Sequence, residues 1–304
     1  MDSPVFLSVL IPAYNWDVGP LLTSLYSQCL HLSEGQRAEI IVMDDGSTEK
    51  FTNRTVAEQL SLVRYEESAV NKGRAEIRNV LLQQAKGVYV LFLDADMLPD
   101  RDDFIQTYLE QGRQGREIVC GGISYCQNKQ KDPEYSFYLY KSGKTEALPS
   151  SVRRSIPWRY LFTSNIMVRR DIMQSVHFDP RFTGYGFEDI EWGIRLGESF
   201  TITHIDNTCS HMGVMSKQQV FSKMRDSIQN YALFLSLHPL KIGRTGAAGL
   251  ASCLKHLPDA LLKLGDLLLS RLFTKIPWNW CLFFIFQCTK AVLLARVLKK
   301  DIKI

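Results

Sequence analysis

Short apolar runs alternate with segments of helical periodicity along the first hundred residues. The runs predict buried strands, because each is a short apolar stretch that ends at polar or turn-forming residues. These strands are expected at residues 5–12, 39–43, 62–65 and 88–93. Between them, the apolar positions of residues 19–32 and 74–86 recur every three or four residues, which predicts helices. Such alternation implies parallel strands joined by right-handed crossovers.

Beyond residue 99 the pattern is less regular, although strands and helices still follow one another. Helices are expected at residues 102–112, 170–176 and 187–197, and strands at residues 117–125, 162–169 and 200–205. The segment 128–157 is polar, aromatic and irregular, so we expect a long loop there. Loops of that length in a compact domain are usually functional or mobile. The fold class is therefore α/β, with a mostly parallel sheet flanked by helices.

The last part of the chain is expected to be helical. Residues 247–273 place leucines at helical spacing with charged residues between them. Residues 278–298 are more apolar, with Trp at the start and two Lys directly after the end, and a Gln, a Lys and an Arg lie within them. Three interpretations stay open for this second helix. It can lie in the headgroup plane of a membrane, pack on the domain or an oligomer partner, or span a bilayer.

Charge divides the chain into the same two parts. Residues 239–304 contain 11 Lys and Arg against 3 Asp, a net charge of +8, while residues 1–238 carry −4. We therefore expect a body at 1–238 and a basic, amphipathic helical tail at 239–304. The charge of the tail indicates an anionic surface as partner, and a membrane surface suits its Trp and apolar residues. The net charge of the whole chain, +4, is too small to indicate nucleic acid.

The remaining composition excludes several classes of protein. Hydrophobic residues make up 45% and charged residues 22%, which is typical of globular proteins and excludes disordered and fibrous ones. The seven cysteines are odd in number and scattered, and no two form a C-x-x-C pair. A disulfide framework or a zinc site is therefore not expected, and a reducing compartment is. The first residues lack the basic segment of a signal peptide, so we expect a cytoplasmic protein.

Polar residues follow three of the predicted strands, at positions 14–15, 44–45 and 94–96. The carboxyl ends of parallel strands meet at one edge of a sheet, where such sheets bind ligands, so the pattern predicts a nucleotide-type site. Asp94 and Asp96 share one face of extended chain, where two carboxylates repel each other unless a cation lies between them. Oxygen ligands suit Mg²⁺ or Mn²⁺. A solvated strand-end loop is the plainer interpretation.

Further acidic residues are candidates for the same site. Asp45 can accept hydrogen bonds from a nucleotide base or ribose, although a turn that caps the following helix explains it equally well. Glu188 and Asp189 follow a Gly-Tyr-Gly loop at the expected start of a helix, whose dipole favours ionised carboxylates. A carboxylate there can act as a base toward an acceptor hydroxyl. Spacing alone does not assign a role to His204 or His211.

In their order along the chain, five stretches resemble a family 2 glycosyltransferase with the GT-A fold. They are residues 9–15 (VLIPAYN), 44–47 (DDGS), 71–79 (NKGRAEIRN), 93–96 (LDAD) and 182–196 (FTGYGFEDIEWGIRL). The last resembles the G-x-G-x-E-D block of galactosyltransferase C-terminal domains and chondroitin-polymerase-type enzymes. The resemblance covers about residues 5–213. It implies a Rossmann-like GT-A sheet of mixed, mostly parallel strands, followed by the amphipathic helical extension.

The resemblance implies a role for individual residues. Asp189 is the catalytic base, and Glu188 contacts the acceptor or the donor sugar. The nucleotide sugar is bound by Pro12, Ala13, Tyr14, Asn15, Asp45, Gly73, Arg78, Asp94, Ala95 and Gly186. The D-x-D motif and a later histidine bind Mn²⁺ (or Mg²⁺) through Asp96, Asp94 and His211. His211 is favoured over His204 because it lies past the strand expected at residues 200–205.

The implied reaction is inverting transfer of a hexosyl or N-acetylhexosaminyl group from a nucleotide sugar, usually UDP-linked, to a glycan or lipid-linked acceptor. Asp189 takes the acceptor proton, while the metal and Arg78 stabilise the departing diphosphate. The chain lacks the Q-x-x-R-W block of processive synthases, so single addition is expected. Surface polysaccharide biosynthesis at the cytoplasmic face of a membrane fits the basic tail. The alternative is a non-catalytic nucleotide-sugar-binding subunit of a glycan-assembly complex.

Overall fold

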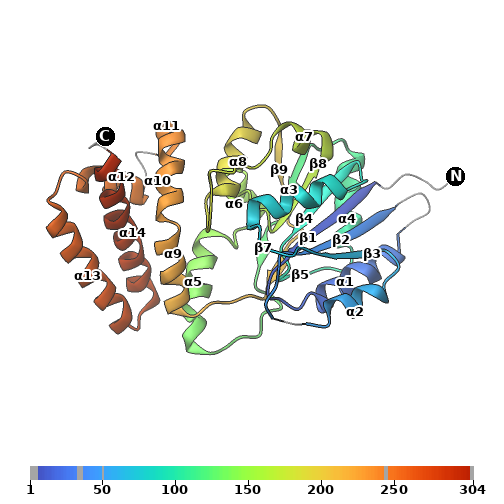
Figure 1. The fold of residues 1–304 in the computed structure, drawn as a ribbon, viewed down its shortest axis with the longest axis horizontal. Coiled ribbons are helices and arrows are strands. Elements are labelled where there is room, and N and C mark those ends of the chain that lie inside the picture. Colours follow the sequence, from blue (N-terminus) through green and yellow to red (C-terminus); the bar gives the residue numbers. More distant parts are fainter. Residues whose placement is uncertain (1–5, 33–36, 50, 243–245, 302–304) are drawn as a thin grey trace. The chain divides into compact units, whose positions relative to one another are not determined.

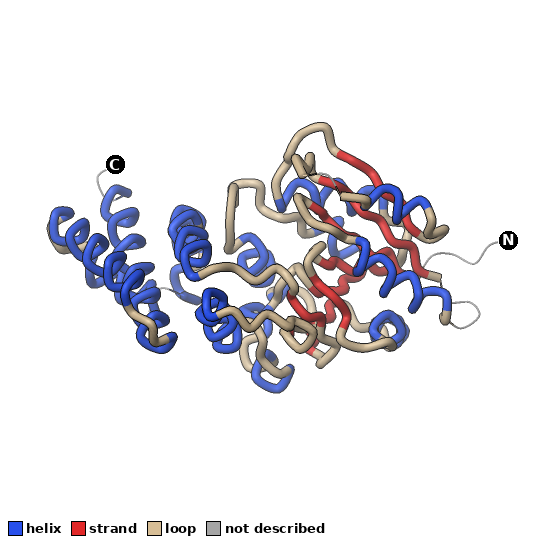
Figure 2. The backbone as a smooth tube through the Cα atoms, turned by 90° about the horizontal axis from the view of Figure 1, so that it is seen from below, coloured by secondary structure: helices blue, strands red, loops and turns tan. Residues whose placement is uncertain are grey.

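A seven-stranded sheet lies in the larger of two units of the computed structural model, which describes residues 6–32, 37–49, 51–242 and 246–301 (Figure 1). The sheet unit consists of the described residues of Met1–Lys129, Thr145–Arg181 and Glu188–Gly213. The helical unit consists of those of Gln130–Lys144, Phe182–Phe187 and Val214–Ile304. Every strand described belongs to the sheet unit, and the described part of the helical unit is built from helices (Figure 2).

The sheet is mixed but mostly parallel, as the sequence predicts. Its strands are β1 (Leu7–Ala13), β2 (Ala38–Asp44), β3 (Val63–Glu67), β4 (Tyr89–Leu93), β6 (Ile118–Cys120), β8 (Asn165–Arg169) and β9 (Ile202–His204). Their order across the sheet is β3-β2-β1-β4-β8-β6-β9. β8 runs antiparallel to both neighbours, β4 and β6, and the other pairs are parallel. The predicted α/β fold class is therefore confirmed.

Helices form a second and a third layer on the two faces of this sheet. They are α1 (Gly19–Leu30), α2 (Asn53–Glu58), α3 (Arg74–Gln84), α4 (Phe104–Arg113), α7 (Arg170–Ser175) and α8 (Glu188–Gly197). Alternate residues of β1 enter different cores: Val9 and Ile11 join the core that includes α1 and α4, and Leu10 joins the core of α3, α7 and α8. Full burial of each such side chain contributes about 1.5–3 kcal/mol.

The strand predicted at residues 117–125 is interrupted at Gly121 and Gly122. β6 ends at Cys120, and β7 (Ile123–Ser124) joins a separate three-stranded sheet with β5 (Met97–Pro99) and β10 (Cys209–His211). Gly122 has φ +95°, a left-handed conformation that ends the strand. A Cβ at this position would lie only 2.6 Å from Nη2 of Arg153, so the guanidinium leaves no room for a side chain. The apolar composition of the segment does not reveal this break.

The prediction of a long loop at residues 128–157 is wrong, because the segment contains helices. They are α5 (Ser136–Thr145), α6 (Ser150–Arg153) and two 3₁₀ turns at Pro133–Tyr135 and Pro157–Tyr160, the second of which ends beyond the segment. In α5 the ring of Phe137 is buried and meets the rings of Phe273 and Phe286 at 5.2 and 5.8 Å between centroids. The partners that stabilise α5 are thus more than a hundred residues away in the sequence, where local pattern does not indicate them.

In the described residues of the helical unit, six further helices follow. They are α9 (Lys217–Asp226), α10 (Ile228–Leu237), α11 (Pro239–Ile242), α12 (Gly246–Leu254), α13 (Asp259–Lys275) and α14 (Asn279–Asp301). The single helix predicted at 247–273 is two helices, because Pro258 lacks a backbone N–H and precedes the first turn of α13. Among the described residues, α14 alone is long and apolar enough to cross a membrane, yet 44% of its most apolar window is buried. It packs against α10, α12 and α13.

Candidate functional site

Three neighbouring parallel strands bring the predicted nucleotide-binding residues to one edge of the sheet. β1 lies between β2 and β4, and Ala13 at its end pairs in register with Asp44. The segments after these strands begin with Tyr14, Asp45 and Asp94. Because parallel strands end at the same edge, the polar groups of these three segments share that edge.

A buried arginine joins two of the predicted carboxylates. Arg78, on α3, is 2% exposed, and its Nη2 donates a 2.6 Å hydrogen bond to Oδ1 of Asp94. Its Nη1 lies 4.0 Å from Oε1 of Glu188. Burial by itself would raise the pKa of Asp94, but the charges of Arg78 and Arg74 and the hydrogen bond from Arg78 hold that pKa below its usual value. Asp94 therefore carries a negative charge at the end of β4.

Asp96 and His211 form a second pair beside the first. Nε2 of His211, at the end of β10, lies 3.4 Å from Oδ2 of Asp96. The backbone reinforces the pair, because the amide of Met212 donates to the carbonyl of Asp96 at 2.8 Å. Gly213 approaches so closely that a Cβ there would lie 2.5 Å from Oδ2 of Asp96. The pKa of Asp96 is raised above its usual value. Burial is the main cause and the negative charge of Asp94 adds to it, while the charge of His211 acts in the opposite direction.

The metal-binding residues predicted from the sequence are thus only partly assembled. In the described part of the chain, no three His, Cys, Asp or Glu side chains are grouped as a site that could hold a metal ion. Asp96 and His211 are adjacent, whereas Oδ1 of Asp94 is engaged by Arg78. The pair offers carboxylate oxygen and imidazole nitrogen, a donor set that fits Mn²⁺.

Glu188 and Asp189 begin α8. Glu188 is buried, and its Oε2 has no hydrogen-bond partner among the residues that the structure describes. Burial, followed by the adjacent charge of Glu188, raises the pKa of Asp189 to about 7. The helix is fixed by Trp192, whose ring is fully buried and whose Nε1 donates to the carbonyl of Val176 at 2.7 Å. A carboxyl whose pKa lies near neutrality is suited to exchange a proton at physiological pH.

The loop before these acids lies in the helical unit. Phe187 has φ +73°, which is strained for a bulky residue, and its ring stacks on Tyr231 at 4.5 Å between centroids. The carbonyl of Gly186 accepts a 2.9 Å hydrogen bond from Nδ2 of Asn230. Gly186 itself has φ +89°. The two glycines of the loop thus permit a turn that α10 holds by stacking and by one hydrogen bond.

Asp45 connects the end of β2 to the start of α3. Its Oδ1 accepts from the amide of Lys72 at 2.7 Å, and its Oδ2 accepts from the amide of Gly73 at 2.9 Å. Nδ2 of Asn71 donates to the carbonyl of Asp45 at 3.0 Å. Both carboxylate oxygens of Asp45 are therefore occupied by backbone in this structure. A nucleotide base that used Asp45 would share these oxygens with the loop or displace it.

Asn15 has a similar connecting role. Its Oδ1 accepts from the amides of Thr48 and Glu49 at 2.8 and 3.0 Å, and its own amide donates to Ser47 Oγ at 2.8 Å. Tyr14 beside it is 49% exposed and presents its ring at the strand end. Of the three remaining predicted contacts, Ala13 and Ala95 are buried and Pro12 is half-buried, so each offers chiefly its backbone.

His204 is a buried structural residue of the sheet unit. Its Nδ1 accepts a 2.7 Å hydrogen bond from Arg153, and its Nε2 donates to the carbonyl of Pro157 at 2.9 Å. Because an arginine can only donate, the ring is neutral with its proton on Nε2. Burial lowers the pKa of His204 to about 4. His204 is thus held by protein groups on both ring nitrogens, whereas Nε2 of His211 faces Asp96.

Arg74 is a charged residue of this site to which the sequence analysis assigns no role. It is exposed in the first turn of α3, and its positive charge acts on Asp94, Asp96 and Asp189. Its only signal in the sequence is its place directly after Gly73. Arg78, for which the family resemblance implies a role, lies one turn further along and is buried.

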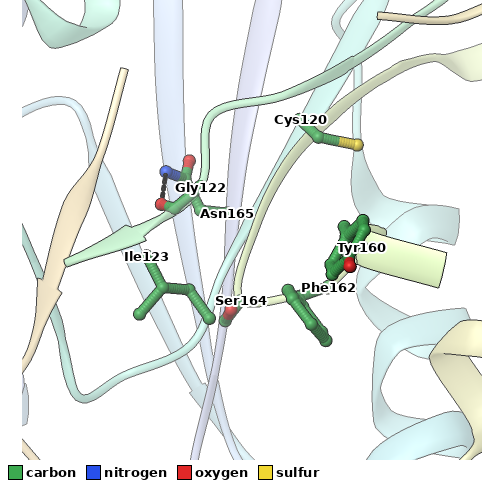
Figure 3. Close-up of a pocket in the computed structure, with 7 residues that line it drawn as sticks. All are labelled: Cys120, Gly122, Ile123, Tyr160, Phe162, Ser164 and Asn165. Atoms are coloured by element: carbon green, nitrogen blue, oxygen red, sulfur yellow. Dashed lines mark hydrogen bonds between the residues drawn. The ribbon is translucent and has the colours of Figure 1, made fainter. Parts of the chain in front are cut away.

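A small pocket lies next to this edge of the sheet. It is a hollow with about 160 Å³ of empty space, part of which is open solvent, and it is lined by Cys120, Gly122, Ile123, Tyr160, Phe162, Ser164 and Asn165 (Figure 3). It adjoins the site because the carbonyl of Ser164 accepts from the amide of Asp94 at 3.3 Å. Inside it, Nδ2 of Asn165 donates to the carbonyl of Gly122 at 2.8 Å (Figure 3). The lining residues leave too little room for a nucleotide sugar.

Comparison with known proteins gives consistent results. The family model "Glycosyl transferase family 2" matches residues 8–176. The uncharacterized glycosyltransferase YfnE of Bacillus subtilis (strain 168) is 27% identical over 244 residues, which cover 63% of this chain and 60% of YfnE. The chain therefore spans three-fifths of the length of that relative.

Two solved structures share the fold. TarS 1–349 of S. aureus superposes with a TM-score of 0.55 at 17% identity, covering 98% of this chain and 91% of TarS 1–349. Mannosyltransferase PcManGT of Pyrobaculum calidifontis, in complex with GDP-Man and Mn²⁺, gives a TM-score of 0.54 at 17% identity, covering 97% of this chain and 88% of PcManGT. At these identities the likeness concerns the fold alone.

Proposed function

The chain belongs to glycosyl transferase family 2, and from this premise we propose that it transfers one sugar from a nucleotide-sugar donor to a hydroxyl of a glycan or lipid-linked acceptor. The observation that carries the proposal is the position of Arg78, within 2.6 Å of Asp94 and 4.0 Å of Glu188. One guanidinium thereby joins the strand end expected to bind the donor to the helix start expected to activate the acceptor. The sugar in our proposal is a hexose or an N-acetylhexosamine.

The donor we propose is linked to UDP. TarS has been solved in complexes with UDP and with UDP-GlcNAc, and PcManGT with GDP-Man, so proteins of this fold bind both kinds of nucleotide sugar. In this chain the donor would lie along the ends of β1, β2 and β4. Tyr14 offers an exposed ring against which a base can stack, and a carboxylate oxygen of Asp45, shared with the loop amides that it already accepts from, would accept from the single N–H of the uracil of UDP.

We propose Mn²⁺, or Mg²⁺, as the cofactor. Asp96 and His211 would hold it, with Asp94 alongside, because a carboxylate and an imidazole 3.4 Å apart present suitable donor atoms. A bound divalent ion supplies positive charge to the departing diphosphate. Arg74, exposed at the start of α3, would add a second positive charge, because its charge already acts on both Asp94 and Asp96.

The transfer we propose is a single displacement with inversion. The Asp189 carboxylate accepts the proton of the acceptor hydroxyl, and the resulting oxygen forms a bond to the anomeric carbon. The bond from that carbon to the diphosphate breaks, and the electron pair leaves with the diphosphate. Asp189 suits the role of base because its pKa of about 7 keeps it ionised at mildly alkaline pH and basic enough to take a proton. Glu188 would contact a hydroxyl of the donor or acceptor sugar.

The resemblance of residues 182–196 to the G-x-G-x-E-D block of galactosyltransferase C-terminal and chondroitin-polymerase-type enzymes supports these two roles. We further propose that residues 1–238 carry the reaction and that the basic tail, residues 239–304, holds the enzyme on the cytoplasmic face of a membrane. There the acceptor would be a precursor of a surface polysaccharide. The net charge of +8 on the tail supports this part of the proposal.

Donor turnover by the purified full chain tests the proposal. Release of the nucleoside diphosphate from a panel of UDP- and GDP-sugars is measured with Mn²⁺ for the wild type and for Asp189→Asn and Asp96→Ala. Asp102→Asn, an exposed carboxylate, is the matched control. We expect turnover of one donor by the wild type and the control, and none by the other two variants. Donor binding without turnover, in the presence of a range of acceptors, would instead support the non-catalytic subunit.

A further inference from the structure

Six leucines at and just before α13 are exposed on the helical unit. They are Leu257, Leu261, Leu264, Leu267, Leu268 and Leu272, each 39–53% exposed, and we call them the leucine face. Positions 261, 264, 268 and 272 recur every three or four residues, so they form one stripe along the helix. α13 packs against α14, and Figure 1 shows it at the edge of the helical unit. Exposed apolar side chains gathered in one stripe are typical of a binding surface.

The acidic residues of α13 lie on its other side and are paired. Asp266 is bound by the guanidinium of Arg225, and Nη1 of Arg296 lies 3.6 Å from it. Asp259 lies 3.4 Å from Nε of Arg296 and 3.0 Å from Nζ of Lys263. These two are the acidic residues of α13. The leucine face therefore contains no negative charge.

Cations do lie on the leucine face. Arg271 and Lys275 follow Leu264 and Leu268 by seven residues, about two helical turns, so they share its side of the helix. Both are exposed. Long basic side chains within an apolar stripe can keep their stems among apolar groups while the charged ends reach a polar layer. Anionic headgroups above an apolar interior provide that arrangement, with no acidic partner needed on the protein side.

Exposed aromatic rings lie at the turn that follows. Trp278, Trp280 and Phe284 are 61%, 66% and 69% exposed, at the junction of α13 and α14. Trp280 and Phe284 are four residues apart on α14 and so share one of its faces. Trp prefers the boundary between the headgroups and the hydrocarbon of a bilayer, where its apolar ring and polar N–H are both accommodated.

We propose that the leucine face of α13 binds the interface of an anionic lipid bilayer, with the helix axis in the membrane plane. The inference rests on the membrane association proposed above and assigns it to α13 rather than to the more apolar α14. Most apolar side chains of α14, among them Leu282, Phe286 and Leu294, are buried within the helical unit. They are unavailable to lipid unless that unit unfolds.

Co-sedimentation with vesicles tests this surface. The full chain is mixed with vesicles of phosphatidylcholine alone, or of equal parts phosphatidylcholine and phosphatidylglycerol. The test variant is Leu264→Gln/Leu268→Gln, because Gln keeps helix propensity on the exposed side. The matched control, Leu240→Gln/Leu250→Gln, changes two exposed leucines of the same unit outside the leucine face. A charge variant, Arg271→Gln/Lys275→Gln, is matched by Lys129→Gln/Lys131→Gln, both exposed.

We expect the wild type and both controls to sediment with the phosphatidylglycerol vesicles. The leucine variant should lose at least about tenfold in bound fraction on either vesicle, and the charge variant should lose its preference for phosphatidylglycerol. If the leucine variant sediments as the wild type does, the assignment of lipid binding to the leucine face is overturned, whereas the proposed membrane association of the tail stands. Failure of the wild type to bind would overturn both.

Two further measurements distinguish lipid binding from self-association and from misfolding. Sedimentation velocity of the wild type and the leucine variant shows whether the face is an interface between copies: a dimer that the variant dissociates would overturn the proposal. Thermal unfolding of each variant shows that it is folded. Turnover of the soluble donor, measured without vesicles, is expected to be unchanged in the leucine variant, so loss of lipid binding is distinguishable from failure of the proposed reaction.

Discussion

Arg78 donates a 2.6 Å hydrogen bond to Asp94 from a position that is almost wholly buried. Its other terminal nitrogen lies 4.0 Å from Glu188, so a single cation is shared by the end of β4 and the start of α8. A guanidinium in that position is shielded from solvent and committed to protein carboxylates. We therefore expect Arg78 to act as a positioning residue for the site, and Arg74, exposed one turn earlier on α3, to meet the diphosphate of the proposed donor.

Removal of the Arg78 charge should therefore affect the fold first. Arg78→Met keeps an unbranched apolar stem of similar length, but leaves Asp94 and Glu188 without their cation. We expect a loss of about 3–5 kcal/mol in the free energy of unfolding, measured by urea denaturation. Arg181→Met is the control, because Arg181 is exposed and pairs with Asp179 at the surface, so its loss should stay below about 1 kcal/mol. Equal losses in the two variants would contradict the positioning role.

Arg74→Ala should behave in the opposite way. Because the side chain is exposed, we expect the free energy of unfolding to change by less than about 0.5 kcal/mol. The KM for the donor should rise about tenfold or more, as expected for loss of a hydrogen bond between charged groups. Steady-state kinetics of donor turnover measures this. Lys86→Ala, an exposed cation just past the far end of α3, serves as control and should leave KM unchanged.

The protonation of Asp189 should set the pH dependence of turnover. Burial and the charge of Glu188 raise the pKa of Asp189 to about 7, and a base must be ionised to accept a proton. We expect the rate to rise about tenfold per pH unit below that value and to level off above it. A rate profile from about pH 5.5 to about pH 8.5 measures this. A profile that is flat through pH 7 would exclude Asp189 as the base.

Stability gives an independent check of the same pKa. Because the pKa of Asp189 is raised on folding from 3.8, its protonated form favours the native state. That contribution is present at low pH and is lost as the pH rises through about 7. Asp189→Asn, which stays neutral, should therefore be more stable than the wild type at pH 8, and this advantage should be clearly smaller at pH 5. Thermal unfolding at the two pH values measures the difference.

The sequence predicts β1, β2 and β4 well, because each of these strands is a short apolar run with nearly every residue buried. β3 is only half-buried, and the sequence does not predict α2. β1, β2 and β4 begin and end within about two residues of the predicted ranges. Two later errors have local causes: Gly122 takes a left-handed conformation, and Pro258 separates α12 from α13. Residues that permit a break also occur inside regular elements, so composition alone does not show where one falls.

The partners of the site residues were less predictable than their identities. Nothing near Asp45 in the sequence indicates that its carboxylate accepts from the amides of Lys72 and Gly73. The burial of Arg78 and the exposure of Arg74 depend on which side of α3 faces the sheet. The sequence order favours His211 over His204, but it does not show that the ring of His204 is engaged by Arg153, some fifty residues earlier.

The two histidines should respond differently to Mn²⁺. His211→Ala removes the imidazole beside Asp96 and should weaken binding of the metal, which isothermal titration calorimetry measures without any donor. We expect a loss of at least about tenfold in affinity, because loss of an outer-shell partner of a ligand already costs about that much. His204→Gln should leave the affinity unchanged, because that ring is engaged by Arg153 and Pro157. Its effect should be lower stability, since Arg153 loses a buried acceptor. Equal metal affinity in both variants would contradict the assignment of His211.

Substitution of two glycines beside Asp45 allows the effect of a steric clash to be distinguished from that of backbone strain. Gly46 and Gly73 have φ of +73° and +83°, so Ala at either site is strained by about 1 kcal/mol or more. A Cβ on Gly46 would also lie 2.8 Å from the backbone nitrogen of Asn71, whereas one on Gly73 would meet nothing within 4 Å. Gly46→Ala should therefore lower the free energy of unfolding by more than Gly73→Ala, as measured by urea denaturation. Because the displaced segment is the loop that Asp45 holds, Gly46→Ala should also weaken donor binding. Equal destabilisation, with donor affinity unchanged in both variants, would show that this loop yields freely and that its contact with Asp45 does not shape the site.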